Sequence, residues 1–131
     1  MKTEPIRPLL ILVVEDNEAN RMLVQAVLEG LGYKVRLASS ATEAHLSLAQ
    51  HRPDLILMDI QLPGQDGLAL TRQLKADPDF ASIPIVAVTA HAMASDRQLS
   101  LEAGCIGYIA KPFNTRTLGA EIQAFLLRAH E

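Results

Sequence analysis

The sequence has few of the residues that several functional classes need. Cys105 is the single cysteine among 131 residues, which excludes an internal disulfide and a cysteine-based zinc site. Aromatic residues make up 4% of the chain and tryptophan is absent, so a surface that stacks nucleic-acid bases is not expected. No apolar run approaches the length of a membrane span, and the start, MKTEPIRP, has no apolar signal region. We therefore expect a cytoplasmic protein that does not enter a membrane.

The chain also lacks an excess of positive charge. Its 12 basic and 15 acidic residues are mixed along the sequence, for a net charge of -3. Neither a basic stripe for nucleic acid nor a polybasic segment for an anionic membrane is present. The length and the 49% hydrophobic content fit one domain with a real core. We expect a lead-in over residues 1–8 and one domain over residues 9–131.

Short apolar runs between chain breakers indicate buried strands. The clearest run is Leu55 to Met58, which lies between Pro53 and the Pro63-Gly64 pair. A strand that is apolar on both faces is typical of a parallel sheet. Five such strands are expected, at residues 9–14, 33–38, 54–58, 85–88 and 107–110. Because helical patterns separate them, the sequence predicts an α/β fold with a five-stranded parallel sheet covered on both faces.

Polar residues mark the starts of the predicted helices. Ser40 and Glu43 have the spacing of a capping box, while Asn17 and Asn114 can cap the first and last helices. The stripe expected to face the core from the first helix consists of Met22, Leu23, Ala26, Val27 and Leu31.

Functional side chains follow the carboxyl ends of four predicted strands. These ends meet at the edge of a parallel sheet where ligands bind. Crowded carboxylates raise one another's pKa unless a cation joins them, and an all-oxygen site with few protein ligands suits magnesium. The residues delivered to this edge are Glu15 and Asp16, Asp59, Thr89 and Lys111.

This set of residues predicts phosphoryl chemistry on Asp59. An aspartate can attack phosphorus to give an acyl phosphate when a metal and positioned donors meet the phosphoryl charge. Lys111 offers a point charge and Thr89 a hydroxyl donor for that purpose. Gln61 and His91 each lie two residues beyond a site residue, so we expect them to flank the attacking water and tune hydrolysis.

Four segments in this order resemble response-regulator receiver domains of two-component signalling: VVEDN at 13–17, LILMDIQLPGQDG at 55–67, VTAHA at 88–92 and YIAKPF at 108–113. The resemblance covers essentially the whole chain. It implies a flavodoxin-like fold of five strand-helix units with strand order 2-1-3-4-5. Within the family, VTAHAM and GCIGYIAKPF are similar to stand-alone receivers and to those of hybrid histidine kinases.

The resemblance also implies roles for single residues. Asp59 would accept a phosphoryl group from a histidine kinase or a histidine phosphotransfer protein, with Thr89 and Lys111 as phosphoryl contacts. The implied magnesium ligands are Glu15, Asp16, Asp59 and the backbone carbonyl of Gln61.

The expected output is a partner surface. The resemblance places it on the helix 93–103, the strand 107–110 and the last helix, with Tyr108 as an aromatic switch that turns inward as Thr89 moves. It further implies a cis peptide bond between Lys111 and Pro112.

Two other classes of protein use a similar sheet. A magnesium-dependent phosphatase with an aspartyl phosphate needs a second acid two positions after the nucleophile, where this chain has Gln61, a poor general acid. A flavin carrier needs aromatic residues that stack on the ring, and only three Phe and two Tyr are present. Turnover of a small phosphate ester, or a bound yellow chromophore, would identify these cases.

Overall fold

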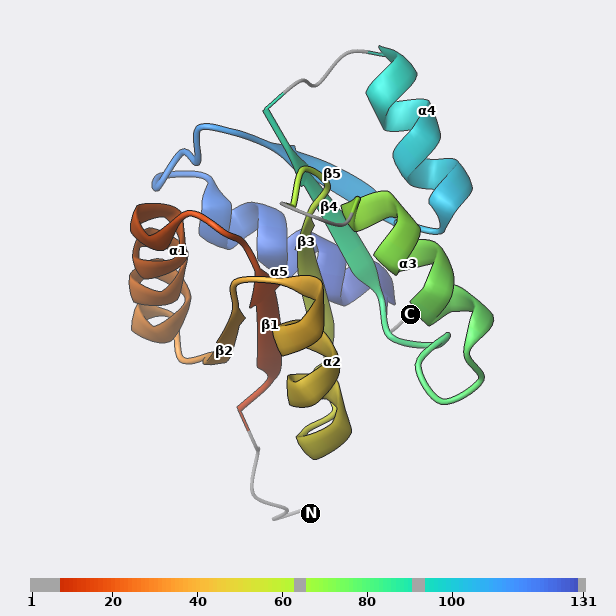
Figure 1. The fold of residues 1–131 in the computed structure, drawn as a ribbon. Coiled ribbons are helices and arrows are strands. Elements are labelled where there is room, and N and C mark those ends of the chain that lie inside the picture. The colour runs from red at the N-terminus through yellow and green to blue at the C-terminus, as the bar shows by residue number, and fades with distance from the viewer. Residues whose placement is uncertain (1–7, 63–65, 91–93, 130–131) are drawn as a thin grey trace, which may run out of the picture.

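Five parallel strands form one sheet, as the sequence pattern predicted, in the order β2-β1-β3-β4-β5 that the resemblance implied (Figure 1). The structure is a computed structural model and describes residues 8–62, 66–90 and 94–129. The strands are β1 (Leu10–Val14), β2 (Lys34–Ala38), β3 (Leu55–Asp59), β4 (Ile85–Thr89) and β5 (Gly107–Ala110). The helices are α1 (Glu18–Gly30), α2 (Ala41–Gln50), α3 (Gly67–Ala76), α4 (Ala94–Ala103) and α5 (Leu118–Ala129).

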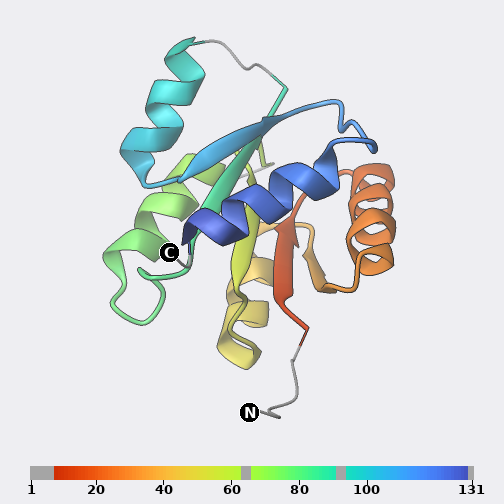
Figure 2. The ribbon, with the colours of Figure 1, turned by 180° about the vertical axis from the view of Figure 1, so that it is seen from behind.

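Helices cover both faces of the sheet (Figures 1 and 2). The helices α1 and α5 pack on one face, and α2 and α3 pack on the other, with α4 beside α3 and β5. Alternate residues of each strand enter the two layers, because side chains of a strand point to opposite faces in turn. In β1, for example, Ile11 and Val13 face α1 and α5, whereas Leu12 and Val14 face α2 and α3. This alternation explains why the strands read as continuous apolar runs.

The ends of the helices follow from local chemistry. The Ser40 side chain accepts a hydrogen bond from the Glu43 backbone N–H at 3.1 Å, and the Asn17 side chain accepts one from Asn20 at 2.9 Å. Gly32 and Gly104 follow α1 and α4 with φ of +95° and +113°, a conformation that favours glycine. Asn114 caps the turn that leads into α5, since its carbonyl accepts from the Leu118 backbone N–H at 2.9 Å. Its side chain accepts from Arg116 in a turn, and α5 begins only at Leu118.

The core stripe predicted for α1 was correct for Val27, which packs against the core, and wrong for the four exposed residues Met22, Leu23, Ala26 and Leu31. Val24 and Leu28 are the buried residues of this helix, whereas Met22 is 61% exposed and Leu31 is 57% exposed. Helix α1 has more apolar residues than fit on one face. The face that includes Val24 is buried because it packs in the same core layer as α5. None of the described helices has the length and apolar character that a membrane span needs.

Gly67 joins the start of α3 to the end of β3. Its backbone N–H donates to the Ile60 carbonyl at 3.2 Å. A Cβ at this position would lie 2.1 Å from the Asp59 carbonyl oxygen and 2.7 Å from the Ile60 Cα. Both neighbours are backbone atoms and cannot turn aside, so only glycine lets α3 approach the strand that carries Asp59.

We expect Gly67→Ala to lower the free energy of unfolding by about 3 kcal/mol, because the added methyl group must push α3 away from β3. Chemical denaturation measures this change. Gly30→Ala is the matched control, since a Cβ at Gly30, the last residue of α1, meets nothing within 4 Å. It should leave stability unchanged or raise it by up to about 1 kcal/mol. Equal stability of the two variants would contradict a tight contact at Gly67.

Candidate functional site

The parallel register brings the carboxyl ends of β1, β3, β4 and β5 together. Val14 pairs with Met58, Asp59 pairs with Val88, and Thr89 pairs with Ala110. The acids that follow β1 therefore lie beside the end of β3, and Lys111 follows β5 at the same edge. The structure thus assembles the edge that the strand ends predicted.

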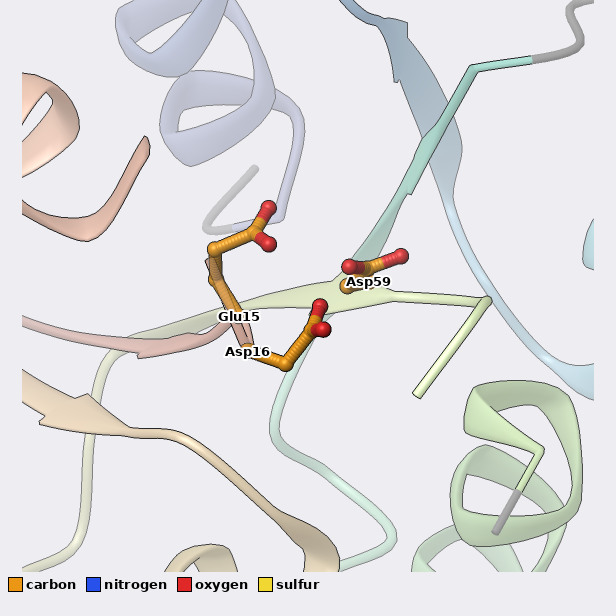
Figure 3. A group of neighbouring side chains, drawn as sticks. All are labelled: Glu15, Asp16 and Asp59. Carbon is orange, nitrogen blue, oxygen red and sulfur yellow. The ribbon is translucent and has the colours of Figure 1, made fainter. Parts of the chain in front are cut away.

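Three carboxylates gather at this edge (Figure 3). One ligand oxygen from each of Glu15, Asp16 and Asp59 lies within 4.8 Å of the others. Glu15 and Asp59 are buried, at 2% and 1% exposure, whereas Asp16 is exposed. Asp16 is therefore the acid of this group that is in contact with solvent.

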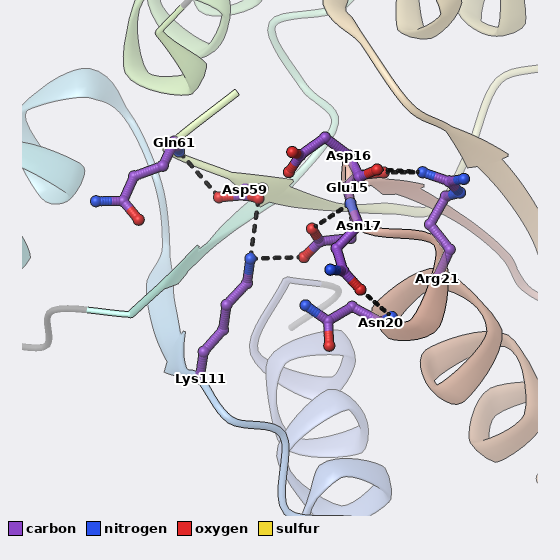
Figure 4. Close-up of polar contacts among 8 residues, drawn as sticks. All are labelled: Glu15, Asp16, Asn17, Asn20, Arg21, Asp59, Gln61 and Lys111. Carbon is purple, nitrogen blue, oxygen red and sulfur yellow. Dashed lines mark hydrogen bonds and ion pairs between the residues drawn. The ribbon is translucent and has the colours of Figure 1, made fainter. Parts of the chain in front are cut away.

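Lys111 supplies the positive charge on one side of the group (Figure 4). Its Nζ lies 2.8 Å from Glu15 Oε1 and 3.0 Å from Asp59 Oδ2. Burial lowers the pKa of the ammonium, but the contacts with Glu15 and Asp59 outweigh this effect, so the net pKa of Lys111 is raised. Lys111 is therefore fully charged at neutral pH. The peptide bond to Pro112 is cis, as the resemblance implied.

The pKa of Glu15 is raised above its ordinary value. Burial is the largest cause, and the charge of Asp59 adds to it. The contact with Lys111 and a hydrogen bond from the Asn17 backbone N–H to Glu15 Oε2, at 3.0 Å, oppose the shift. The sequence had predicted that the crowded acids raise one another's pKa, and the charge of Asp59 does act on Glu15 in that direction, although burial has the larger effect.

The donor set fits a divalent cation that prefers oxygen. Glu15 Oε1 is buried and meets Lys111 as an ion pair, yet it accepts no hydrogen bond from any residue that the structure describes. A buried carboxylate oxygen with free lone pairs beside two further acids is an arrangement that a second cation stabilises. Magnesium matches it, because this ion takes one or two carboxylates and keeps several waters.

The other predicted residues occupy different positions around the group. The Gln61 backbone N–H donates to Asp59 Oδ1 at 2.9 Å, while its exposed side chain extends away from the acids (Figure 4). Thr89 is buried at the end of β4, where its carbonyl accepts from the Lys111 backbone N–H at 2.8 Å. Tyr108 is half-buried, and Arg97 Cζ of α4 lies 4.9 Å from its ring centroid. His91 lies outside the described residues.

Sequence reasoning missed one residue that touches the site. Arg21 of α1 donates from Nη1 to the carbonyl oxygens of Glu15 and Asp16, at 2.9 and 2.8 Å. An arginine in the first turns of a helix carries no signal for such a contact, because its partners are backbone atoms that any residue supplies.

Comparison with known proteins agrees with this geometry. A model of the response regulator receiver domain family matches residues 11–123. The polar-differentiation response regulator DivK of Brucella anthropi is 41% identical over 119 residues, which cover 91% of this chain and 97% of that protein. The crystal structure of a putative response regulator from Chloroflexus aurantiacus superposes with a TM-score of 0.87 at 34% identity, covering 93% of this chain and 100% of that one.

A further similar structure is the receiver domain of the sensor histidine kinase PA1611 from Pseudomonas aeruginosa, with a magnesium ion coordinated in its active site cleft. It has a TM-score of 0.81 and 40% identity, and the match covers 95% of this chain and 100% of that one.

The parallel sheet with an acidic group at its edge is the architecture of a single-domain α/β protein with a candidate metal site, and the comparisons give its family. The chain belongs to the response regulator receiver domains of two-component signalling. Domains of this family interact with histidine kinases or phosphotransfer proteins and with downstream targets. The chain is thus a signalling protein, and family membership does not favour the alternative of a phosphatase that acts on external substrates.

We expect Mg²⁺ to stabilise the protein against heat, because an ion that binds only the folded state shifts unfolding by mass action. At about 100 times its dissociation constant the gain is about 2.7 kcal/mol. Asp16→Ala should lose most of this gain, whereas Asp79→Ala, at an exposed loop position, should keep it. Thermal unfolding with magnesium and with EDTA gives the comparison. The same response in wild type and both variants would argue against a metal at this edge.

Proposed function

We propose that Asp59 accepts a phosphoryl group from the phosphohistidine of a histidine kinase or a histidine phosphotransfer protein. The observation that carries the proposal is the orientation of its carboxylate. Oδ1 accepts from the Gln61 backbone N–H at 2.9 Å, and Oδ2 meets Lys111 Nζ at 3.0 Å. These two contacts hold the group in one direction and leave lone pairs for attack. An oriented carboxylate beside positive charge suits phosphoryl transfer, where catalysis is mostly positioning and electrostatics.

The transfer exchanges one bond to phosphorus for another. An oxygen of Asp59 bonds to phosphorus as the bond to the imidazole nitrogen breaks, and that nitrogen keeps the electron pair. Lys111 and the Thr89 hydroxyl meet the charge of the phosphoryl oxygens. In hydrolysis a water oxygen later bonds to phosphorus as the bond between phosphorus and the Asp59 oxygen breaks; that oxygen keeps the electron pair, so the carboxylate is restored and phosphate carries away the protons of the water. The chain thus catalyses only its own phosphorylation and dephosphorylation.

Magnesium fits this role as the second cation. Glu15, Asp16 and Asp59 would hold it, with the Gln61 carbonyl as a further ligand. When bound, the ion neutralises part of the phosphoryl charge. Support comes from the buried Glu15 oxygen without a hydrogen bond and from the ion in the Pseudomonas aeruginosa receiver domain.

The proposed output surface is the face formed by α4, β5 and α5. By strand alternation Thr89 and Tyr108 belong to the same face of the sheet, since Ala87 pairs with Tyr108 and Thr89 pairs with Ala110. A shift of Thr89 toward the phosphoryl group would vacate space beside Tyr108. The contact of Arg97 with the Tyr108 ring would then carry the change to α4.

We expect Asp59→Asn to lower phosphoryl incorporation to background while the fold stays intact, because an amide cannot replace the carboxylate as nucleophile. The protein is incubated with magnesium and acetyl phosphate, or with a phosphorylated histidine kinase, and the product is measured by mass spectrometry. Asp79→Asn is the matched control at an exposed loop site. Incorporation by Asp59→Asn at the wild-type level would place the nucleophile elsewhere and overturn the proposal.

Gln61 and His91 are proposed to tune the lifetime of the acyl phosphate. An imidazole changes charge near neutral pH, so the hydrolysis rate should depend on pH between about 6 and 8 through His91. His91→Ala should remove this dependence, whereas His45→Ala, at an exposed position of α2, should retain it. Decay of the phosphorylated protein across this pH range is the measurement. Superimposable decay curves for wild type and His91→Ala would exclude His91 from hydrolysis.

A further inference from the structure

Arg21 ties the backbone of both acids that follow β1 to helix α1 (Figure 4). Its Nη1 donates to the Glu15 carbonyl oxygen at 2.9 Å and to the Asp16 carbonyl oxygen at 2.8 Å. A charged donor makes stronger hydrogen bonds than a neutral one. One guanidinium nitrogen therefore holds two successive carbonyl groups of the segment that presents the acids.

These two carbonyl groups decide where the acids point. The Glu15 side chain points toward Lys111 and the Asn17 backbone N–H, whereas the Asp16 side chain points away from both (Figure 4). Because peptide units are planar, rotation of either carbonyl swings the adjacent side chain with it. A contact that fixes both carbonyl groups therefore also keeps the two carboxylates pointing in different directions.

The helix itself does not explain a cation at this position. A positive charge in the first turns of α1 opposes the helix dipole, which favours negative charge there. The carbonyl oxygens are the partners that stabilise Arg21 in this place. Its charge also reaches the start of α2, where the pKa of Glu43 is lowered first by hydrogen bonds from Ser39 and, in smaller part, by Arg21.

We propose that Arg21 is a positioning residue for the magnesium site, which keeps the Asp16 carboxylate within reach of Asp59. The inference rests on the function proposed above. Two effects of Arg21 on magnesium have opposite signs. Its charge repels a divalent cation, whereas its hydrogen bonds preorganise the ligands. Removal of the guanidinium therefore raises magnesium affinity if charge dominates and lowers it if positioning dominates.

The experiment compares Arg21→Met, which keeps the length of the side chain but has no donor, with Arg21→Lys, which keeps the charge. Arg72→Met is the matched control, because it removes one positive charge from an exposed site on α3. Isothermal titration with magnesium chloride gives the dissociation constant, and thermal unfolding in EDTA gives the stability without metal. We expect Arg21→Met to bind magnesium about 10-fold more weakly, the low end for loss of a residue that orients a ligand. Arg21→Lys should lose less, and Arg72→Met should match wild type.

Each outcome bears on the inference. Magnesium affinity of Arg21→Met equal to or above that of wild type overturns it, as does a lower unfolding temperature in EDTA with an unchanged dissociation constant. If Arg21→Met does not fold, Arg21→Gln and Arg21→Lys replace it, and wild-type affinity in both overturns the inference. If wild type itself binds no magnesium, the proposed metal site fails and the inference with it. A failure of Arg21 alone leaves wild-type binding and Asp59 phosphorylation intact.

Discussion

Electrostatic repulsion at one edge of the sheet is the constraint on which the rest of the structure depends. The parallel register places Glu15 and Asp16 beside Asp59, and burial of two of these acids strengthens their repulsion. Lys111 offsets part of it through contacts of 2.8 and 3.0 Å. Three carboxylates beside one partly buried lysine still leave negative charge in excess. The excess negative charge therefore favours the binding of a second cation at this edge.

The alternation of side chains places the acidic group and Tyr108 on opposite faces of the sheet. Side chains two positions apart on a strand share a face. Glu15 therefore shares the face of Val13, Asp59 that of Leu57 and Lys111 that of Ile109, and this face is the one covered by α1 and α5. Thr89 and Tyr108 belong to the other face, because Ala87, two residues before Thr89 on β4, pairs with Tyr108. A phosphoryl group on Asp59 would thus be sensed across the thickness of the sheet. β4, which carries Thr89, ends beside the acids, and Tyr108 of the neighbouring β5 contacts Arg97 of α4.

Close backbone contacts keep this edge in place. Gly67 allows α3 to touch the carbonyl of Asp59, and Arg21 binds the carbonyls of Glu15 and Asp16 from α1. Both contacts act on the main chain and not on the acidic side chains. The positions of the carboxylates therefore depend on how two helices on opposite faces of the sheet pack against it.

The sequence alone determined the strands, their parallel pairing and the residues at their carboxyl ends, because strands buried on both faces must be apolar throughout and can change character only where they end. Asp59 and Lys111 could be predicted for this reason, and the Ser40 cap could be predicted from its spacing to Glu43. Only the tertiary structure decided which face of α1 is buried, since Met22 and Val24 are equally apolar and packing against α5 chooses between them. It also decided the contacts of Arg21, because backbone carbonyls are identical in every residue and only the fold places two of them before one guanidinium.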